Sequence, residues 1–432
     1  ELERWLAEPV CFAVLPAGCF VPNASGFPVL PKRLKALLQG LLRRGAQVIF
    51  SGGEGGQAAE TEPESSRRAR LEYVARLFSA QPPPSEAEKF SASHLDCLQA
   101  PLQPLHDNLD SETYEVFETD PVKYVQYEEA VLQFLRDWAA RPGGAPAGAR
   151  PPCTVMVLGA GRGPLVAASL RASARAGVEV DVWAVEKNPN AVHTLRHRQR
   201  TEESWGRVQV VAHDMRTWQA PRKADAIVSE LLGSFGDNEL DPECLDGALR
   251  FLAEDGVSIP TSYSSSLAPV LAPGLWTEAR GRGAGSGDPK DLETGYVVCI
   301  HKAFYPSSGA KDCFSFEHPN RTLRSNDRFA ELSFTMEADA LVHGFAGYFD
   351  CVLYGTARIS IRPDTFSEGM FSWFPMFFPL QAPVFVRKGE TLCCHWWRRH
   401  NARQVWYEWA LSEPAATPVH NAGGRSWAIG LV

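Results

Sequence analysis

The chain has 432 residues, of which 44% are hydrophobic and 22% are charged, an ordinary balance for globular proteins. This length exceeds one common domain of about 100–200 residues, so we expect two or three domains. No apolar run reaches the roughly 18 residues of a membrane-spanning helix, so we expect no membrane partner. The net charge of −8 argues against direct nucleic-acid binding and favours a basic partner or substrate.

The ten cysteines are scattered and form no C-x-x-C or His-spaced pair, so the sequence predicts no metal site. Several of them lie in apolar runs, as Cys153 and Cys299 do, which is typical of reduced thiols inside a cytosolic or nuclear protein. The chain begins at Glu1 without an apolar leader, and we interpret it as a fragment or processed chain of a soluble protein.

The first 80 residues predict a small α/β unit. Short apolar runs at 11–15 and 47–50 are typical of strands, and the apolar spacing at 32–44 and 67–78 predicts helices. A single β-α-β unit cannot close a hydrophobic core, so we expect residues 1–80 to be the end of a larger α/β domain.

Strands and helices alternate in the next part, residues 81–260. We expect helices at 121–138, 164–176 and 190–199, and strands at 153–158, 179–185, 208–212 and 224–229. Such alternation implies a parallel, doubly wound sheet of the α/β class. After Pro260, β-rich runs at 262–270, 329–334, 357–361, 384–386 and 405–411 predict an antiparallel sandwich or barrel over residues 261–432.

Three consecutive predicted strands end on residues that suit a nucleoside ligand. Gly159 and Gly161 follow the first strand, where glycine permits a close approach to the backbone and the next helix offers free N–H groups. Glu186 ends the second strand and suits ribose hydroxyls, while Asp214 and Met215 after the third suit an adenine amino group and ring. This order fits S-adenosylmethionine and dinucleotides alike, and a tight turn without a ligand stays an alternative for the glycine loop.

The fourth strand favours S-adenosylmethionine. It leads to Glu230 and, nine residues later, to Glu239, with a Gly-containing loop between them. Two carboxylates match the forked donors of a guanidinium, and could orient one of its nitrogens towards a methylsulfonium. Isolated acids of this kind are more often exposed loop residues, and only their position after this strand makes them catalytic candidates. Asp237 lies in the same loop, and the sequence gives it no role.

Four segments resemble the protein arginine methyltransferases, in the family's order: residues 157–165, 185–191, 229–239 and 369–375. The resemblance is closest to the type II branch, which makes symmetric dimethylarginine as the catalytic part of the methylosome, and it extends over essentially the whole chain. It implies a class I Rossmann-like methyltransferase domain, an antiparallel β-barrel-like domain for substrate and oligomerisation, and a partial TIM-barrel remnant in residues 1–80. Stretches 196–205, 280–288 and 310–316 resemble the family only loosely, and we expect surface loops there.

The resemblance also implies roles for individual residues. The Lys123 ammonium would pair with the methionyl carboxylate, and Trp373 would stack on the substrate guanidinium. Phe117 resembles the position that favours the symmetric product. The cofactor ligands would be Tyr114, Lys123, Tyr124, Gly159, Gly161, Glu186, Asp214 and Met215, the catalytic pair Glu230 and Glu239, and the substrate-specificity residues Phe117, Leu231, Ser372 and Trp373.

The implied reaction uses S-adenosyl-L-methionine to give monomethylarginine and symmetric dimethylarginine in Arg/Gly-rich proteins, namely histone tails and spliceosomal Sm proteins. The resemblance further implies a homo-oligomer, a WD-repeat methylosome partner, and a location in cytoplasm and nucleus. Two alternatives stay open: a methyltransferase for small molecules, and a catalytically weak scaffold fragment of the methylosome.

Overall fold

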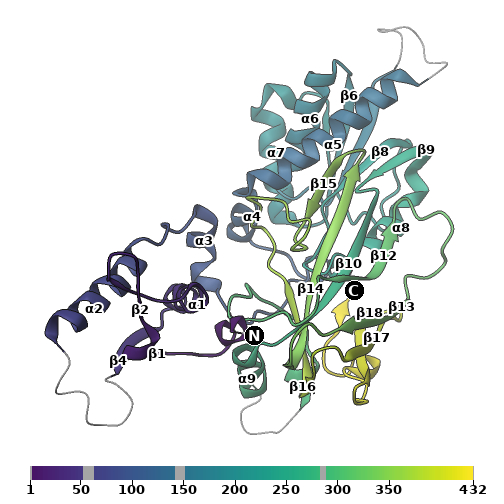
Figure 1. The fold of residues 1–432 in the computed structure, drawn as a ribbon. Coiled ribbons are helices and arrows are strands. Elements are labelled where there is room, and N and C mark those ends of the chain that lie inside the picture. The colour runs from purple at the N-terminus through teal and green to yellow at the C-terminus, as the bar shows by residue number, and fades with distance from the viewer. Residues whose placement is uncertain (1, 52–62, 142–150, 283–288, 432) are drawn as a thin grey trace.

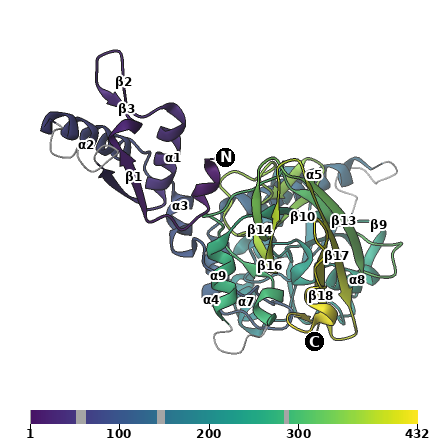
Figure 2. The same ribbon diagram turned by 60° about the horizontal axis from the view of Figure 1, so that its bottom comes forward.

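A computed structural model of the chain describes residues 2–51, 63–141, 151–282 and 289–431. A small N-terminal lobe stands apart from a larger body, in which helices and parallel strands adjoin a layer of long antiparallel strands (Figure 1). The turned view in Figure 2 shows the same lobe projecting from the body. No helix in the described ranges is long and apolar enough to cross a membrane.

The N-terminal lobe is built on the predicted β-α-β unit. Strand β1 pairs with β4 in parallel, and helices α1 and α2 cover them with a small core that includes Leu38 and Val74. Phe12 and Val14 on β1 each remain 55% exposed, so two strands and two helices bury only part of their apolar surface. The elements are β1 (Phe12–Pro16), β2 (Val21–Pro22), β3 (Pro28–Val29), α1 (Lys32–Arg43), β4 (Gln47–Ser51) and α2 (Glu64–Ser79).

The central part is the predicted doubly wound sheet. Its five parallel strands lie in the order β7-β6-β5-β8-β9, and all six residues of β5 are buried, as expected where helices cover both faces. Its strands and their helices are β5 (Cys153–Leu158), α6 (Pro164–Ala176), β6 (Val180–Glu186), α7 (Pro189–Thr201), β7 (Val208–Ala212), β8 (Ala224–Ser229), α8 (Asp241–Ala248) and β9 (Leu252–Ile259).

Between the N-terminal lobe and this sheet, the described residues form the α-helices α3 (Glu86–Ser91), α4 (Ser111–Glu118) and α5 (Pro121–Ala140). Pro121 is the first residue of α5, where its missing N–H costs nothing, and Asp120 caps the helix by accepting from the N–H of Val122. Helix α5 packs against α6 on one side and against the antiparallel strands β14 and β15 on the other. It therefore joins the two large parts of the body.

The C-terminal part contains two antiparallel sheets. One has the order β11-β16-β14-β10-β12 with β15 beside β14, and the other has the order β13-β17-β18-β19. Aromatic rings fill the space between them, for example Phe378 against Trp396 at 5.1 Å and Trp396 stacked on Trp409 at 5.7 Å. The elements are β10 (Ser262–Val270), α9 (Pro273–Arg282), β11 (Tyr296–Val297), β12 (Lys311–Glu317), β13 (Arg328–Thr335), β14 (Ala340–Tyr354), β15 (Ala357–Ser360), β16 (Met376–Val386), β17 (Thr391–His400), β18 (Gln404–Glu413) and β19 (Ile429–Gly430).

The three expected surface loops differ in outcome, and residues 283–288 of the stretch 280–288 lie outside the described residues. The stretch 310–316 forms most of β12, which pairs with β10 and buries Phe314 and Phe316. The stretch 196–205 lies mostly on the surface, as expected, but it forms the end of α7 and a short 3-10 helix rather than a loop, and it buries Trp205. Weak similarity to a family is therefore a poor guide to exposure in 310–316, because Phe314 and Phe316 fill the core there.

Candidate active site

A cavity at the carboxyl ends of the parallel strands, here called the glycine-loop cavity, contains most of the predicted site residues. Its walls include Tyr114, Phe117, Tyr124, Gly159, Gly161, Glu186, Asp214, Met215, Glu230, Leu231 and Glu239. Gly159 and Gly161 have φ values of +67° and +54°, which favour glycine, and a Cβ on Gly161 would lie 3.1 Å from the Tyr114 ring. The loop therefore leaves bare backbone facing the cavity.

Glu186, at the end of β6, is held by the backbone. One carboxylate oxygen accepts from the N–H of Gly161 at 2.8 Å and the other from the N–H of Asn188 at 2.7 Å. Burial raises the pKa of Glu186, and these N–H groups oppose that rise. Each oxygen keeps a further lone pair, so the oriented carboxylate can also accept from a ligand hydroxyl.

Asp214, which follows β7, has a partner that the sequence did not predict. Both of its carboxylate oxygens accept from Arg216, with the Arg216 Nη2 atom 2.7 Å from Oδ2. Burial alone would raise the pKa of Asp214, but the Arg216 hydrogen bonds outweigh burial and lower it. The carboxylate therefore stays ionised beside Met215, and its predicted contact with an adenine stays a prediction.

The two predicted catalytic carboxylates have different surroundings. Glu230 follows β8, and its Oε2 atom lies 3.3 Å from the Lys123 ammonium. Glu239 ends the short 3-10 turn Asp237–Glu239, and its pKa is raised well above the usual range by burial and then by the Glu230 charge, with Lys123 acting in the opposite direction. The two acids therefore form an electrostatically coupled pair in which only Glu230 has a close cationic partner.

Lys123 lies behind the cavity wall. Its side chain is 1% exposed, and its ammonium lies 4.9 Å from the centre of the Tyr124 ring, 4.8 Å from that of Trp373 and 5.5 Å from that of Phe117. Cation–π contacts of this kind stabilise a buried ammonium. In this structure the Lys123 ammonium pairs with Glu230. The predicted pairing of Lys123 with a methionyl carboxylate stays a prediction.

A second cavity, here called the aromatic cavity, opens on the other side of Glu239. It is lined mainly by aromatic and other apolar side chains, with a few polar ones: Phe90, His94, Gln99, Ala100, Pro101, Leu102, Val116, Phe117, Ser234, Asn238, Glu239, Val297, Phe371, Ser372, Trp373 and Phe374. Phe117 and Glu239 line both cavities, so they form the wall that the cavities share. The predicted substrate residues Ser372 and Trp373 thus face a different space from the predicted cofactor residues.

Asp120 is a site residue that the sequence analysis missed. One carboxylate oxygen of Asp120 caps α5, while the other accepts from the N–H of Phe371 at 2.9 Å and from the N–H and hydroxyl of Ser372 at 2.9 and 2.8 Å. The Trp373 indole also donates to the carbonyl of Leu232 at 2.8 Å. An Asp before Pro121 signals a helix cap, but nothing local indicates that it also holds residues 371–373.

Family models match the chain in three consecutive parts. Residues 1–80 match a model described as the PRMT5 TIM barrel domain, 85–259 the PRMT5 arginine-N-methyltransferase, and 262–429 the PRMT5 oligomerisation domain. The whole chain is 47% identical to protein arginine N-methyltransferase 5 of Xenopus laevis over 66% of that protein, and 44% identical to the protein of that name in Oryza sativa subsp. indica over 68% of it. The chain belongs to the PRMT5 family of protein arginine N-methyltransferases. It spans about two thirds of the length of these PRMT5 relatives.

Solved structures of other arginine methyltransferases share the fold of the body. The Trypanosoma brucei PRMT1 enzyme–prozyme complex with AdoHcy superposes with a TM-score of 0.58 at 14% identity, over 73% of this chain and 96% of that chain. Arabidopsis thaliana protein arginine methyltransferase 10 gives 0.55 at 15% identity, over 74% and 97%. The predicted fold class is therefore confirmed, as is the predicted likeness to the PRMT5 family.

Proposed function

We propose that this chain transfers methyl groups from S-adenosyl-L-methionine to arginine side chains of proteins. The observation that carries the proposal is the wall between the two cavities, where Glu239 faces both the glycine-loop cavity and the aromatic cavity. A cofactor on one side and a side chain entering from the other would meet at this carboxylate. Membership of the PRMT5 family supports the same reaction.

The residues of the glycine-loop cavity fit S-adenosylmethionine. Gly159 and Gly161 present bare backbone to the cavity, Glu186 offers oriented acceptors for hydroxyls, and Met215 gives an apolar surface for a ring. Of the other predicted ligands, Tyr114, Tyr124 and Asp214 line the same cavity, and Lys123 lies behind its wall. When bound, this cofactor would supply a methyl group on a positively charged sulfur.

Glu230 and Glu239 would bind the substrate guanidinium and orient one terminal nitrogen. The guanidinium supplies the positive charge that Glu239 lacks in the free site, and so lowers the raised pKa of that carboxyl. The nitrogen that gains the methyl group loses one proton, because a guanidinium is fully protonated beforehand. Of the two carboxylates, we assign Glu239 as the acceptor for that proton, because burial and then the Glu230 charge raise its pKa, whereas Glu230 already has the Lys123 ammonium 3.3 Å away.

The product we propose is monomethylarginine followed by symmetric dimethylarginine. The Phe117 ring lies on the shared wall, where it limits the space beside the reacting nitrogen. A nitrogen that already carries a methyl group would not fit there again, and the second methyl group would go to the other terminal nitrogen. Trp373, with Ser372 and Leu231, would complete the walls around the substrate.

The proposed substrates are Arg/Gly-rich segments, including histone tails and spliceosomal Sm proteins. A chain of net charge −8 attracts such basic segments over a distance. We also propose a homo-oligomer, a WD-repeat methylosome partner, and a location in cytoplasm and nucleus. A catalytically weak methylosome scaffold is the second candidate, favoured by the exposed Phe12, Val14 and Ile49 of the N-terminal lobe, which could contact further protein.

The test is a titration with S-adenosylmethionine followed by mass analysis of an Arg-Gly peptide and of a free small amine. The proposal expects cofactor binding, two methyl groups on the peptide arginine, and no turnover of the amine. Binding without any turnover would favour the scaffold, and turnover of the amine alone would favour a small-molecule enzyme. Fragmentation of the dimethyl product distinguishes the symmetric form from the asymmetric one.

A further inference from the structure

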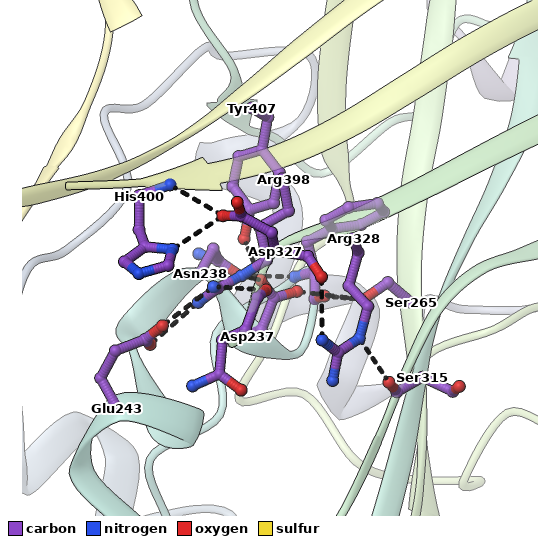
Figure 3. A network of polar contacts seen from close by, with 12 residues as sticks. Asp237, Asn238, Glu243, Ser265, Ser315, Asp327, Arg328, Arg398, His400 and Tyr407 are labelled. Atoms are coloured by element: carbon purple, nitrogen blue, oxygen red, sulfur yellow. Dashed lines mark hydrogen bonds and ion pairs between the residues drawn. The ribbon is translucent and has the colours of Figure 1, made fainter. Parts of the chain in front are cut away.

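The loop between Glu230 and Glu239 is fastened at its centre to the antiparallel sheets. Gly233 and Gly236 exchange backbone hydrogen bonds of 2.9 and 2.8 Å, and the Phe235 ring inserts among the aromatic rings, 5.2 Å from Phe378 and 5.6 Å from Tyr407. These contacts fix residues 233–236 of the loop but do not include residues 237–239. A buried polar network then holds the segment that carries Glu239 (Figure 3).

Asp237 lies two residues before Glu239 and is fully buried. Its Oδ2 atom accepts from Arg398 Nε at 2.5 Å and from the Tyr407 hydroxyl at 2.6 Å. Its Oδ1 atom, at 3.1 Å, shares the Ser265 hydroxyl proton with the Phe235 carbonyl, at 2.6 Å. Burial and then the Asp237 charge raise the pKa of Tyr407 well above its usual range, so the phenol keeps its proton and donates. Three strands, β10, β17 and β18, thus supply donors to one carboxylate.

Arg398 also binds the chain on the other side of Glu239. Its two Nη atoms each donate to a carboxylate oxygen of Glu243 at 2.9 Å, and Nη1 donates to the carbonyl of Asn326 at 3.0 Å. Glu243 is on α8, four residues after Glu239. One guanidinium with no exposed surface therefore grips the chain two residues before and four residues after Glu239.

Such a network is poorly explained by stability alone. A buried ion pair loses hydration on both partners, and apolar side chains of similar size often stabilise a fold equally well. What a bidentate Arg–carboxylate pair provides in addition is fixed geometry. Asp237, Arg398 and Tyr407 line neither the glycine-loop cavity nor the aromatic cavity, so a direct contact with either ligand does not explain them.

We propose that Asp237, Arg398 and Tyr407 are positioning residues that hold the Glu239 carboxylate opposite Glu230. The inference rests on the proposed function, because the value of this position is the clamp on the guanidinium. The antiparallel sheets would then contribute to catalysis, because residues of β17 and β18 fix the position of Glu239 on a loop of the methyltransferase domain. A shift of the carboxylate by about 1 Å would lower turnover as much as 100-fold.

The test compares two variants that each remove one buried hydroxyl. Tyr407→Phe removes the donor to Asp237, while the control Tyr348→Phe removes a hydroxyl that donates to Tyr305 at 3.0 Å from a side chain 2% exposed. We expect Tyr407→Phe to lower kcat about 10-fold to 100-fold, with the peptide KM and the cofactor Kd changed less than about twofold. The Tyr348→Phe variant should keep the kcat of the unmodified chain.

The pH dependence of kcat/KM is a second measurement, and it would not change if Tyr407 only stabilised the fold. In Tyr407→Phe the acid limb of kcat/KM should shift to lower pH, because a displaced Glu239 experiences less of the Glu230 charge that raises its pKa. Equal kcat values and equal acid limbs in the two variants would overturn the inference. A fall in kcat that comes with an equal loss of cofactor binding would overturn it too.

Hydrogen exchange of residues 233–240 separates this inference from the proposed function. Exchange in this segment should accelerate in Tyr407→Phe and stay unchanged in Tyr348→Phe, whether or not the chain methylates a peptide. Absence of turnover in the unmodified chain would contradict the proposed function, and the exchange data would still decide whether the network holds the segment. Unchanged exchange in Tyr407→Phe would overturn the inference.

Discussion

The two cavities of the candidate site differ in how the chain builds them. In the glycine-loop cavity, Gly159, Glu186 and Asp214 lie at the carboxyl ends of successive strands of one parallel sheet. In the aromatic cavity, Leu102, Ser234 and Trp373 come from segments far apart in the sequence. The first cavity forms because the parallel strands all end at the same edge of the sheet. The second forms only where individual contacts, such as those of Asp120, hold segments that are distant in the sequence. Substitutions should therefore affect the two ligands separately.

Glu239, on the shared wall, should give the largest effect. We expect Glu239→Gln to lower kcat for an Arg-Gly peptide by about 10²–10³-fold or more, because the amide can neither pair with the guanidinium nor take its proton. The cofactor Kd, measured by titration, should change less than about twofold. Loss of cofactor binding together with turnover would mean that Glu239 supports the whole pocket rather than the clamp.

Glu186 should affect only the glycine-loop cavity. Glu186→Gln replaces an acceptor with a donor beside Gly161 and Asn188, and we expect the cofactor Kd to weaken about 10-fold to 100-fold. At saturating cofactor, the peptide KM should be unchanged. Glu179→Gln, just before the same strand and with a side chain 73% exposed, is the matched control and should bind cofactor normally. Equal affinities for the two variants would show that Glu186 is not a ligand.

Asp120 should affect mainly the aromatic cavity. Asp120→Ala removes the acceptor of Phe371 and Ser372, and we expect the peptide KM to rise about 10-fold, as for the loss of hydrogen bonds to a charged group. Asp110→Ala is the control, because Asp110 caps α4 through the N–H of Thr113 and bonds no part of 371–373. A rise in KM of the same size in both variants would point to general loss of helix structure.

Lys123 should change the pH dependence rather than the maximum rate. The Lys123 charge lowers the pKa of Glu239, which burial and Glu230 raise, and kcat/KM falls as pH drops through that pKa. In Lys123→Met the acid limb of the kcat/KM profile should therefore move to higher pH. A shift to lower pH, or none, would show that the ammonium does not act on this carboxylate.

Phe117 should give the smallest change in rate and a change in product. Phe117→Leu widens the shared wall, so a methylated nitrogen can return to the reacting position and asymmetric dimethylarginine should appear beside the symmetric form. Total methylation should stay within about a few-fold of the unmodified chain. Fragmentation of the product peptide measures the ratio, and an entirely symmetric product would remove Phe117 from the specificity residues.

The contrast between the glycine-loop cavity and the aromatic cavity also explains which parts of the fold and site could be predicted from the sequence. Four of the five strands of the α/β part could be predicted, because they are apolar runs bounded by glycine, proline and acidic residues, as at 153–158 and 224–229. Strand β9 and the helices α3, α4 and α8 were missed. The glycine loop and the two glutamates also follow from local order. Strand β14, the 15-residue centre of the antiparallel part, was missed because most of its side chains are buried and the alternation typical of half-exposed strands is absent.

The anchors of the substrate side could not be predicted for another physical reason. Arg398 stands in a run of Trp, Arg and His residues and would ordinarily be placed on the surface, but its partner Asp237 lies 161 positions away. Asp120 likewise meets Ser372 only through the fold, across 252 positions. A single sequence holds no signal for such pairs, because their energy depends on which segments the fold brings together.

The most direct test of the central claim is methyl transfer to two peptides that differ only in the central residue, Arg or Lys, between glycines. Because Glu230 and Glu239 match a forked guanidinium rather than a single ammonium, the Arg peptide should gain two methyl groups and the Lys peptide none. Mass analysis after incubation with S-adenosylmethionine gives the answer. Equal methylation of both peptides, or none of either in a chain that binds the cofactor, would contradict a guanidinium clamp at the shared wall.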